Sequence, residues 1–187
     1  MNKLIAFFTL VLVSSVGVLL PPFLKADANA PLPDNHINET PPVPKQLPTS
    51  KAYKLFTKEN FSDRFTTHIL TVAKNKNVDP VLVYAVMKQE SQFKLRAKSN
   101  AGACGALQVM PFHFGRQAKN CSEPYLNVNY GVGILADCLE KAGGNLKVAL
   151  SLYNSGRKNG YLRFPETRYY VSKITSDYYN LKGSKNV

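Results

Sequence analysis

The sequence predicts a mostly α-helical domain, and three observations lead to this fold class. Apolar residues recur at helical spacing beyond residue 60, one helix start is strongly marked, and alternating strand patterns are scarce. The first helix is expected over residues 62–76, where the recurring apolar residues are Phe65, Ile69, Val72 and Ala73.

The marked helix start is the pair Asp79-Pro80, because aspartate caps helices well and proline suits the first helical position. This pair predicts a second helix over residues 81–92. A glycine-containing loop follows at residues 99–105, and a short turn or hairpin is expected within residues 101–108. Further helices are expected over residues 111–119, 130–142, 146–153 and 166–181.

The N-terminal third has a different composition. Residues 1–30 are expected to be a signal peptide or an N-terminal membrane anchor, because Lys3 precedes an uncharged apolar run and small residues end the segment. Either alternative predicts an exported protein, periplasmic or associated with the cell envelope, with inner-membrane anchoring in the second case. Residues 31–50 are rich in proline and predict an extended linker, which leaves residues 51–187 as the folded domain.

The formal net charge is +12, and all of the excess lies beyond residue 48. A basic domain favours polyanions, and an anionic cell wall is one of them. The lysines and arginines are scattered, without the clustered basic block that is typical of nucleic-acid binding, so no nucleic-acid partner is expected.

The chain has three cysteines, Cys104, Cys121 and Cys138. This number is compatible with one disulfide and one free thiol in an oxidising compartment. Their spacing does not decide the pairing. The chain has no CxxC pair and only three dispersed histidines, so neither a metal site nor a cofactor is predicted.

Glu90 is the main candidate for chemistry. Leu82, Val86 and Glu90 follow one another at intervals of four residues, which places the carboxyl group on or beside an apolar helical stripe. Partial burial disfavours the charged form, raises the pKa and lets the group act as a general acid near neutral pH. The alternative is a solvated glutamate near a helix end.

Four ordered segments follow from Glu90 onward. They are Glu90-Ser91-Gln92-Phe93 with Ser99 and the loop GACGALQVMP (102–111), NVNYGVG (127–133), ALSLYNSG (149–156) and PETRYYV (165–171). In order and spacing they resemble the motifs of the lytic transglycosylase catalytic domain, although Ala106 and Leu107 replace that family's central Leu-Met. The resemblance implies a lysozyme-like helical fold with a cleft for the peptidoglycan glycan chain of N-acetylglucosamine and N-acetylmuramic acid.

The resemblance also implies residue roles. Glu90 becomes the acid/base, and the candidates for groove and sugar contacts are Ser99, Gln108, Met110, Tyr153, Asn154 and Glu166. Two of these have structural alternatives, since Met110 also suits core packing and Glu166 also suits a structural hydrogen-bond acceptor.

The sequence bears on the mechanism as well. Hydrolytic glycosidases usually need two carboxylates, but residues 91–122 contain none. This favours a one-acid route in which Glu90 serves as acid and then as base, and a 1,6-anhydromuramoyl end forms without water. The residues that folding could still supply as a second carboxylate are Glu123, Asp137, Glu140 and Glu166.

Two other functions remain open, a hydrolytic muramidase and a non-catalytic wall-binding assembly factor. The expected partners are peptidoglycan glycan strands and, as a second possibility, a cell-envelope-spanning assembly. The sequence leaves the setting open between wall turnover, a secretion or conjugation apparatus, and viral entry or lysis.

Overall fold

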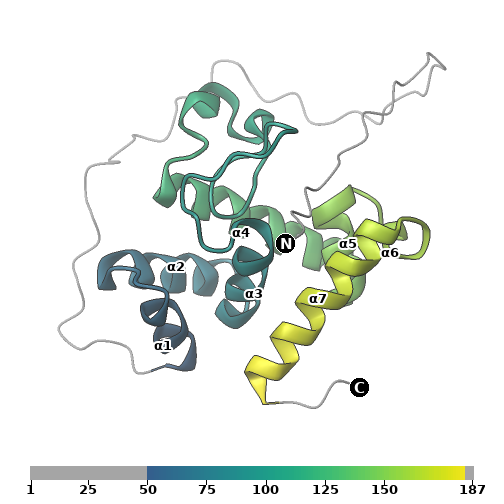
Figure 1. Cartoon of the computed structure of the whole chain (residues 1–187), viewed down its shortest axis with the longest axis horizontal. Coiled ribbons are helices and arrows are strands. Elements are labelled where there is room, and N and C mark those ends of the chain that lie inside the picture. Colours follow the sequence, from purple (N-terminus) through teal and green to yellow (C-terminus); the bar gives the residue numbers. More distant parts are fainter. Residues whose placement is uncertain (1–49, 184–187) are drawn as a thin grey trace, which may run out of the picture. The chain divides into compact units, whose positions relative to one another are not determined.

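Helices build the part of the chain that the computed structural model describes, residues 50–183 (Figure 1). In chain order they are α1 Lys51–Lys58, α2 Asp63–Asn75, α3 Pro80–Ser91, the 3-10 helix η1 Pro111–Asn120, α4 Pro124–Lys141, α5 Leu146–Ser155, α6 Gly160–Arg163 and α7 Pro165–Lys182. The expected segment 1–30 and all of the linker except Ser50 lie outside the described residues. No helix within residues 50–183 is long and apolar enough to cross a membrane. The mostly α-helical fold class is confirmed.

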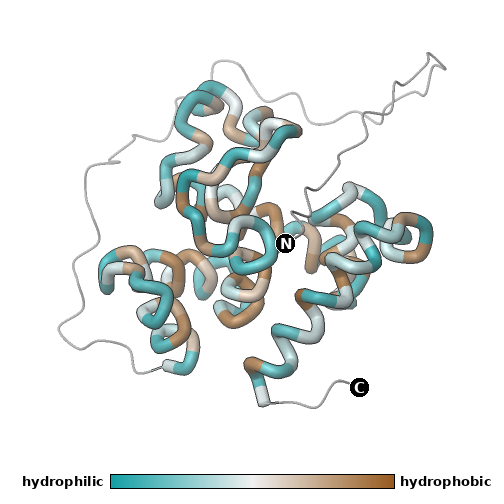
Figure 2. Tube along the Cα trace, viewed as in Figure 1, coloured by the Kyte–Doolittle hydropathy of each residue, from teal (hydrophilic) through white to brown (hydrophobic). Residues whose placement is uncertain are grey.

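Helix α3 forms the centre of the hydrophobic core. Val83, Ala85, Val86 and Met87 are fully buried in it, and hydrophobic residues dominate this stretch of the chain (Figure 2). Helices α1, α2 and α7 all pack against α3. A helix that is covered on several sides must be apolar on several sides, which explains why α3 has little polar surface before its last turn.

Most of the expected helices are present, and the cap predicted at Asp79 is observed. The Asp79 carboxylate accepts a hydrogen bond from the Val81 N–H at 2.8 Å, and the Ser62 hydroxyl accepts one from the Phe65 N–H at 3.3 Å. The helices expected over residues 62–76, 81–92, 146–153 and 166–181 are therefore confirmed as α2, α3, α5 and α7.

Three details differ from the sequence-based expectation. Residues 111–119 form a 3-10 helix with a kink, because Gly115 has φ 51°. Helix α4 begins at Pro124 rather than near residue 130, since proline at its first position starts a helix through residues of low helix propensity. The short helices α1 and α6 were not separately predicted. Around residues 101–108, two isolated antiparallel bridges, Lys98 with Cys104 and Cys104 with Val109, form the expected turn region.

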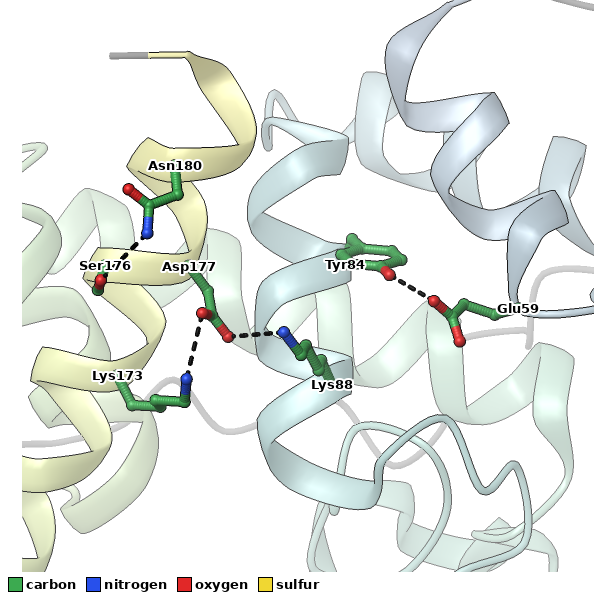
Figure 3. Close-up of polar contacts among 7 residues, drawn as sticks. All are labelled: Glu59, Tyr84, Lys88, Lys173, Ser176, Asp177 and Asn180. Atoms are coloured by element: carbon green, nitrogen blue, oxygen red, sulfur yellow. Dashed lines mark hydrogen bonds and ion pairs between the residues drawn. The ribbon is translucent and has the colours of Figure 1, made fainter. Parts of the chain in front are cut away.

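Ionic contacts fix α7 against α3. The carboxylate of Asp177 in α7 forms a salt bridge of 3.1 Å with Lys88 of α3 and one of 3.3 Å with Lys173 of α7 (Figure 3). In the same view, Tyr84 on α3 points toward Glu59 at the end of α1 and donates a hydrogen bond to it. Polar side chains of α3 thus reach α7 and the end of α1, two of the three helices that pack against it.

A second link joins the start of α3 to the end of α7. Asp79 accepts hydrogen bonds from the Tyr178 hydroxyl at 2.9 Å and the Lys182 ammonium at 2.8 Å. Burial alone would raise the pKa of Asp79, but the bonds from Lys182, the Val81 N–H and Tyr178 outweigh it and lower the pKa. The two links together set the position of α7 along α3.

The cysteine pairing that the sequence left open is resolved. Cys104 and Cys121 form a disulfide across 17 residues, and Cys138 is a buried free thiol on α4. The disulfide ties the glycine-containing loop to the residue that follows η1.

We predict that replacing Cys104 and Cys121 together with alanine lowers the free energy of unfolding by about 3 kcal/mol, because the cross-link closes a loop of intermediate length. Denaturant unfolding measures the change. Cys138→Ala is the control, which removes a cysteine but no cross-link. If reductant destabilised the double variant as much as the unaltered chain, the assigned pairing would be wrong.

Candidate active site

Glu90 lies in the last turn of α3, and its side chain is partly buried, as its spacing predicts. Its carboxylate oxygen Oε1 accepts a 2.6 Å hydrogen bond from the hydroxyl of Tyr170, a buried residue of α7. The two residues are 80 positions apart in the chain. The contact between α3 and α7 therefore brings an acid and a phenol together in the core.

The surroundings of Glu90 raise its pKa from 4.5 to about 7. Burial is the main cause, because it disfavours the charged carboxylate; the Tyr170 hydrogen bond opposes it and lowers the pKa. With a pKa near 7, the group is present in both protonation states near neutral pH. It has the property of a residue that can donate a proton and later accept one.

The chain leaves α3 through a strained turn directly after Glu90. Gln92 and Phe93 have φ 52° and 64°, a left-handed conformation that is uncommon for residues other than glycine. The Phe93 ring compensates by packing on Tyr84 at a centroid distance of 4.8 Å. Ser91 is buried and donates its hydroxyl to the Met87 carbonyl, so it stabilises the helix end.

The glycine-containing loop that follows is held by Asn127, a fully buried residue of α4. Its side-chain oxygen accepts from the Leu107 N–H at 2.9 Å, and its amide donates to the carbonyls of Cys104 at 2.8 Å and Cys121 at 2.9 Å. One side chain thereby satisfies two backbone groups of the loop and one of Cys121, the residue that follows η1. The loop packs so closely here that a Cβ at Gly105 would lie 2.2 Å from the Asn127 side chain.

Tyr153 on α5 holds the same loop from another side. Its hydroxyl donates a 2.8 Å hydrogen bond to the carbonyl of Leu107. Burial, and then the negative charge of Glu90, raise the pKa of Tyr153 well above its ordinary value, so the phenol stays protonated. Tyr153 therefore lies close enough to Glu90 to be affected by its charge, and its own proton is engaged with the loop.

Ser99 and Gln108 serve the internal structure of the loop. The Ser99 hydroxyl accepts from the Ala103 N–H at 3.0 Å, and the Gln108 amide donates to the carbonyl of Gly105 at 2.9 Å. Gln108 has φ 48°, a conformation that its side-chain bond helps to hold. Both residues remain partly exposed, so these bonds do not remove them from the loop surface.

The other three candidates lie in different environments. The Asn154 side-chain oxygen accepts a 2.8 Å bond from the Thr167 hydroxyl, which joins α5 to α7. Met110 is partly exposed just before η1. Glu166 is exposed in the first turn of α7, where a negative charge suits the helix dipole. None of these three residues has a hydrogen bond to Glu90 among the contacts of residues 50–183.

Two residues at this site were not singled out from the sequence. Tyr170 and Asn127 both lie inside recognised motifs, in PETRYYV and NVNYGVG, but nothing in their local patterns marks them. The signal that could have found Tyr170 is its position four residues after Glu166 on a helix that was predicted. Its pairing with Glu90 depends on tertiary contact.

Within residues 50–183, no second carboxylate contributes to the raised pKa of Glu90. Burial and the Tyr170 bond are the causes of its pKa shift. Of the acids considered as a second carboxylate, Glu123 is exposed and accepts two hydrogen bonds from the Arg96 guanidinium, at 2.8 and 3.3 Å. Asp137, Glu140 and Glu166 are exposed on α4 and α7.

The fold is shared with solved structures. An inactive variant of the lytic transglycosylase Slt from Pseudomonas aeruginosa aligns at a TM-score of 0.57 and 22% identity, over 70% of this chain and 27% of its own. The 70 kDa soluble lytic transglycosylase from Escherichia coli aligns at a TM-score of 0.56 and 22% identity, over 66% and 26%. At such identities the likeness establishes the fold, the lysozyme-like helical class.

The family follows from the sequence. Residues 68–166, more than half of the chain, match the model of the Transglycosylase SLT domain. The chain belongs to this family.

Two relatives from Salmonella typhimurium show how the chain compares in length. A soluble lytic murein transglycosylase is 28% identical over 107 residues, which are 51% of this chain and 16% of the relative. The invasion protein IagB is 29% identical over 127 residues, which are 61% of this chain and 76% of the relative. The chain thus spans a small part of the former and most of the latter.

We predict that Glu90→Gln stabilises the protein above pH 7. Between pH 4.5 and about 7 the native state keeps a proton on Glu90 that the unfolded state has lost, so the unfolding free energy of the unaltered chain falls as pH rises through this window. The variant lacks this loss. The free energy of unfolding of the variant should exceed that of the unaltered chain by up to about 3 kcal/mol at pH 8, and the two should be equal at pH 4.

Denaturant unfolding at pH 4, 6 and 8 measures this difference. Glu140→Gln, which removes an exposed carboxylate of α4, controls for the loss of one charge. A stability difference that did not change with pH would contradict the burial of Glu90.

We also predict that Tyr170→Phe raises the pKa of Glu90 above about 7, because the variant loses the hydrogen bond that stabilises the carboxylate. NMR titration of the glutamate side-chain carboxyl carbons measures the pKa directly. Tyr178→Phe is the matched control, since it removes a phenol from the same helix that bonds to Asp79 instead. An unchanged or lower pKa in Tyr170→Phe would exclude the assigned role.

Proposed function

We propose that the protein is a peptidoglycan lytic transglycosylase that cleaves the β-1,4 bond after N-acetylmuramic acid and leaves a 1,6-anhydro end. One observation carries this proposal: the partly buried Glu90, with its pKa raised to about 7, is hydrogen-bonded to Tyr170. The membership in the Transglycosylase SLT domain family supports the substrate class.

In the first step, protonated Glu90 donates its proton to the glycosidic oxygen, and the bond from that oxygen to C1 of N-acetylmuramic acid breaks. The Tyr170 hydroxyl stabilises the carboxylate that forms, because it already donates to Oε1. The 2-acetamido group of the sugar stabilises the positive charge at C1. Positive charge at C1 and negative charge on Glu90 thus appear together.

In the second step, the Glu90 carboxylate takes the proton from the C6 hydroxyl of the same sugar, and O6 forms a bond to C1. The sugar closes on itself and Glu90 is protonated again, so no water is consumed. The pKa effects on Glu90 support this route over hydrolysis, since no second carboxylate contributes to them within residues 50–183.

The loop anchored by Asn127 and Tyr153 is the proposed wall of the glycan groove. Ser99, Gln108 and Met110 are partly exposed on or beside it and are the proposed sugar contacts there, together with Asn154 and Glu166 from α5 and α7. No metal or cofactor takes part in the proposed chemistry. The groups that act are a carboxyl group, a phenol and the substrate's own hydroxyl.

The proposed location is outside the cytoplasm, in the periplasm or cell envelope, with residues 1–30 as the export signal and residues 31–50 as a linker. A membrane anchor and a role beside an envelope-spanning assembly remain proposals of the same kind.

We predict that the full chain releases 1,6-anhydro muropeptides from purified peptidoglycan and that Glu90→Gln lowers the rate by at least about 100-fold, because the amide cannot donate the proton. Mass spectrometry of the products gives the measurement, since anhydro and reducing ends differ by one water. Glu123→Gln, which removes an exposed acid, should keep the activity.

Each other outcome points to a different function. Reducing ends from the unaltered chain would make it a hydrolytic muramidase. Absence of products from chains that bind peptidoglycan would favour a wall-binding assembly factor.

A further inference from the structure

A hollow of about 410 Å³ lies between α5, α6 and α7, apart from the site described above. Its lining comes mainly from one face of α7, where Arg168, Ser172, Thr175 and Tyr179 follow at helical spacing. Tyr170, the partner of Glu90, lies about half a turn away from this face. A ligand in the hollow would therefore not occupy the same place as a sugar at Glu90.

The charge of the hollow is positive. Lys147 of α5 and Arg168 of α7 line it, and none of its lining residues is acidic. The acids of α7 lie toward the opposite face, where Asp177 is paired with Lys88 of α3. Arg168 uses two of its five N–H donors on the carbonyls of Tyr161 and Leu162, which leaves three for another acceptor.

The position of Lys147 is unfavourable for the helix that carries it. It lies in the first turn of α5, where the helix dipole favours anions over cations. Helix stability therefore does not explain a cation here, whereas an anionic ligand would.

The lining also includes two aromatic side chains. Tyr161 and Tyr179 add apolar ring surface to the same lining.

We propose that this hollow is a second binding site, which takes the terminal carboxylate of a short peptide such as the peptide stem of peptidoglycan. Two cations suit the carboxylate, and the aromatic rings suit the small apolar side chains that precede it. The volume fits a small ligand and exceeds what a single inorganic anion needs. The choice of peptidoglycan as the source rests on the proposed function, and the site would hold the protein on peptide-bearing wall.

The test uses diacetyl-L-Lys-D-Ala-D-Ala, which carries one free carboxylate, and its C-terminal amide, both titrated into the full chain by calorimetry or NMR. We expect the acid to bind at least tenfold tighter than the amide. Lys147→Met should weaken binding of the acid about tenfold. The matched control Lys74→Met removes an exposed lysine of α2 and should leave binding unchanged.

A second pair of variants separates binding from folding. Tyr179→Leu removes an aromatic ring of the lining and should weaken binding at least threefold without lowering the thermal stability. Tyr169→Leu removes an exposed tyrosine of α7 outside the lining and should leave binding unchanged. Equal effects of the two variants on binding would overturn the proposal.

Further outcomes are also decisive. Equal binding of acid and amide, or no binding of either, would overturn the proposed site. Stronger binding of inorganic phosphate than of the peptide would overturn the choice of ligand.

The Glu90→Gln variant should bind the peptide as tightly as the unaltered chain does. Peptide binding without glycan cleavage by the unaltered chain would refute the proposed function alone, and cleavage without peptide binding would refute this site alone.

Discussion

The hydrogen bond from Tyr170 to Glu90 is the interaction on which the arrangement of the site depends. It joins two helices that are 80 residues apart in the sequence, and it is short, at 2.6 Å. Burial favours the neutral carboxyl group while the phenol favours the charged one, so a small shift of α7 would change the balance between them. The link from Asp177, two turns beyond Tyr170, to Lys88 helps to hold α7 in place.

Leu107 connects the second half of the site to the same core. The Leu107 N–H donates a hydrogen bond to the Asn127 side chain of α4, and the Leu107 carbonyl accepts one from the Tyr153 hydroxyl of α5. Side chains from two different helices thus satisfy both backbone polar groups of this buried residue. The departure from the family's Leu-Met pair falls here, at Ala106 and Leu107. Both residues are fully buried, so this departure lies in the core of the domain and not on the exposed surface of the loop.

Local chemistry made much of the fold predictable. The cap at Asp79 and the spacing from Leu82 to Glu90 concern residues within one helix, and they predicted both the helix and the partial burial of the acid. The partner Tyr170 and the disulfide between Cys104 and Cys121 depend on contacts between distant segments, which spacing does not encode. Motif patterns likewise do not separate a residue that contacts a ligand from one that holds a loop. Ser99 and Gln108 show this, since both make bonds within the loop.

Within residues 50–183 no second carboxylate contributes to the raised pKa of Glu90, and this bears on how the proposed mechanism works. A second carboxylate beside Glu90 would disfavour the charged form further, and the pair would share one proton. In the proposed mechanism, Glu90 is a neutral acid before bond cleavage and a carboxylate stabilised by one phenol after it, with a pKa close to neutral pH. A site with this balance needs no separate base, provided that the substrate supplies the nucleophile. The burial that raises the pKa of Glu90 also destabilises its charged form in the folded protein, so the proposed chemistry and the stability of the domain are coupled through one side chain.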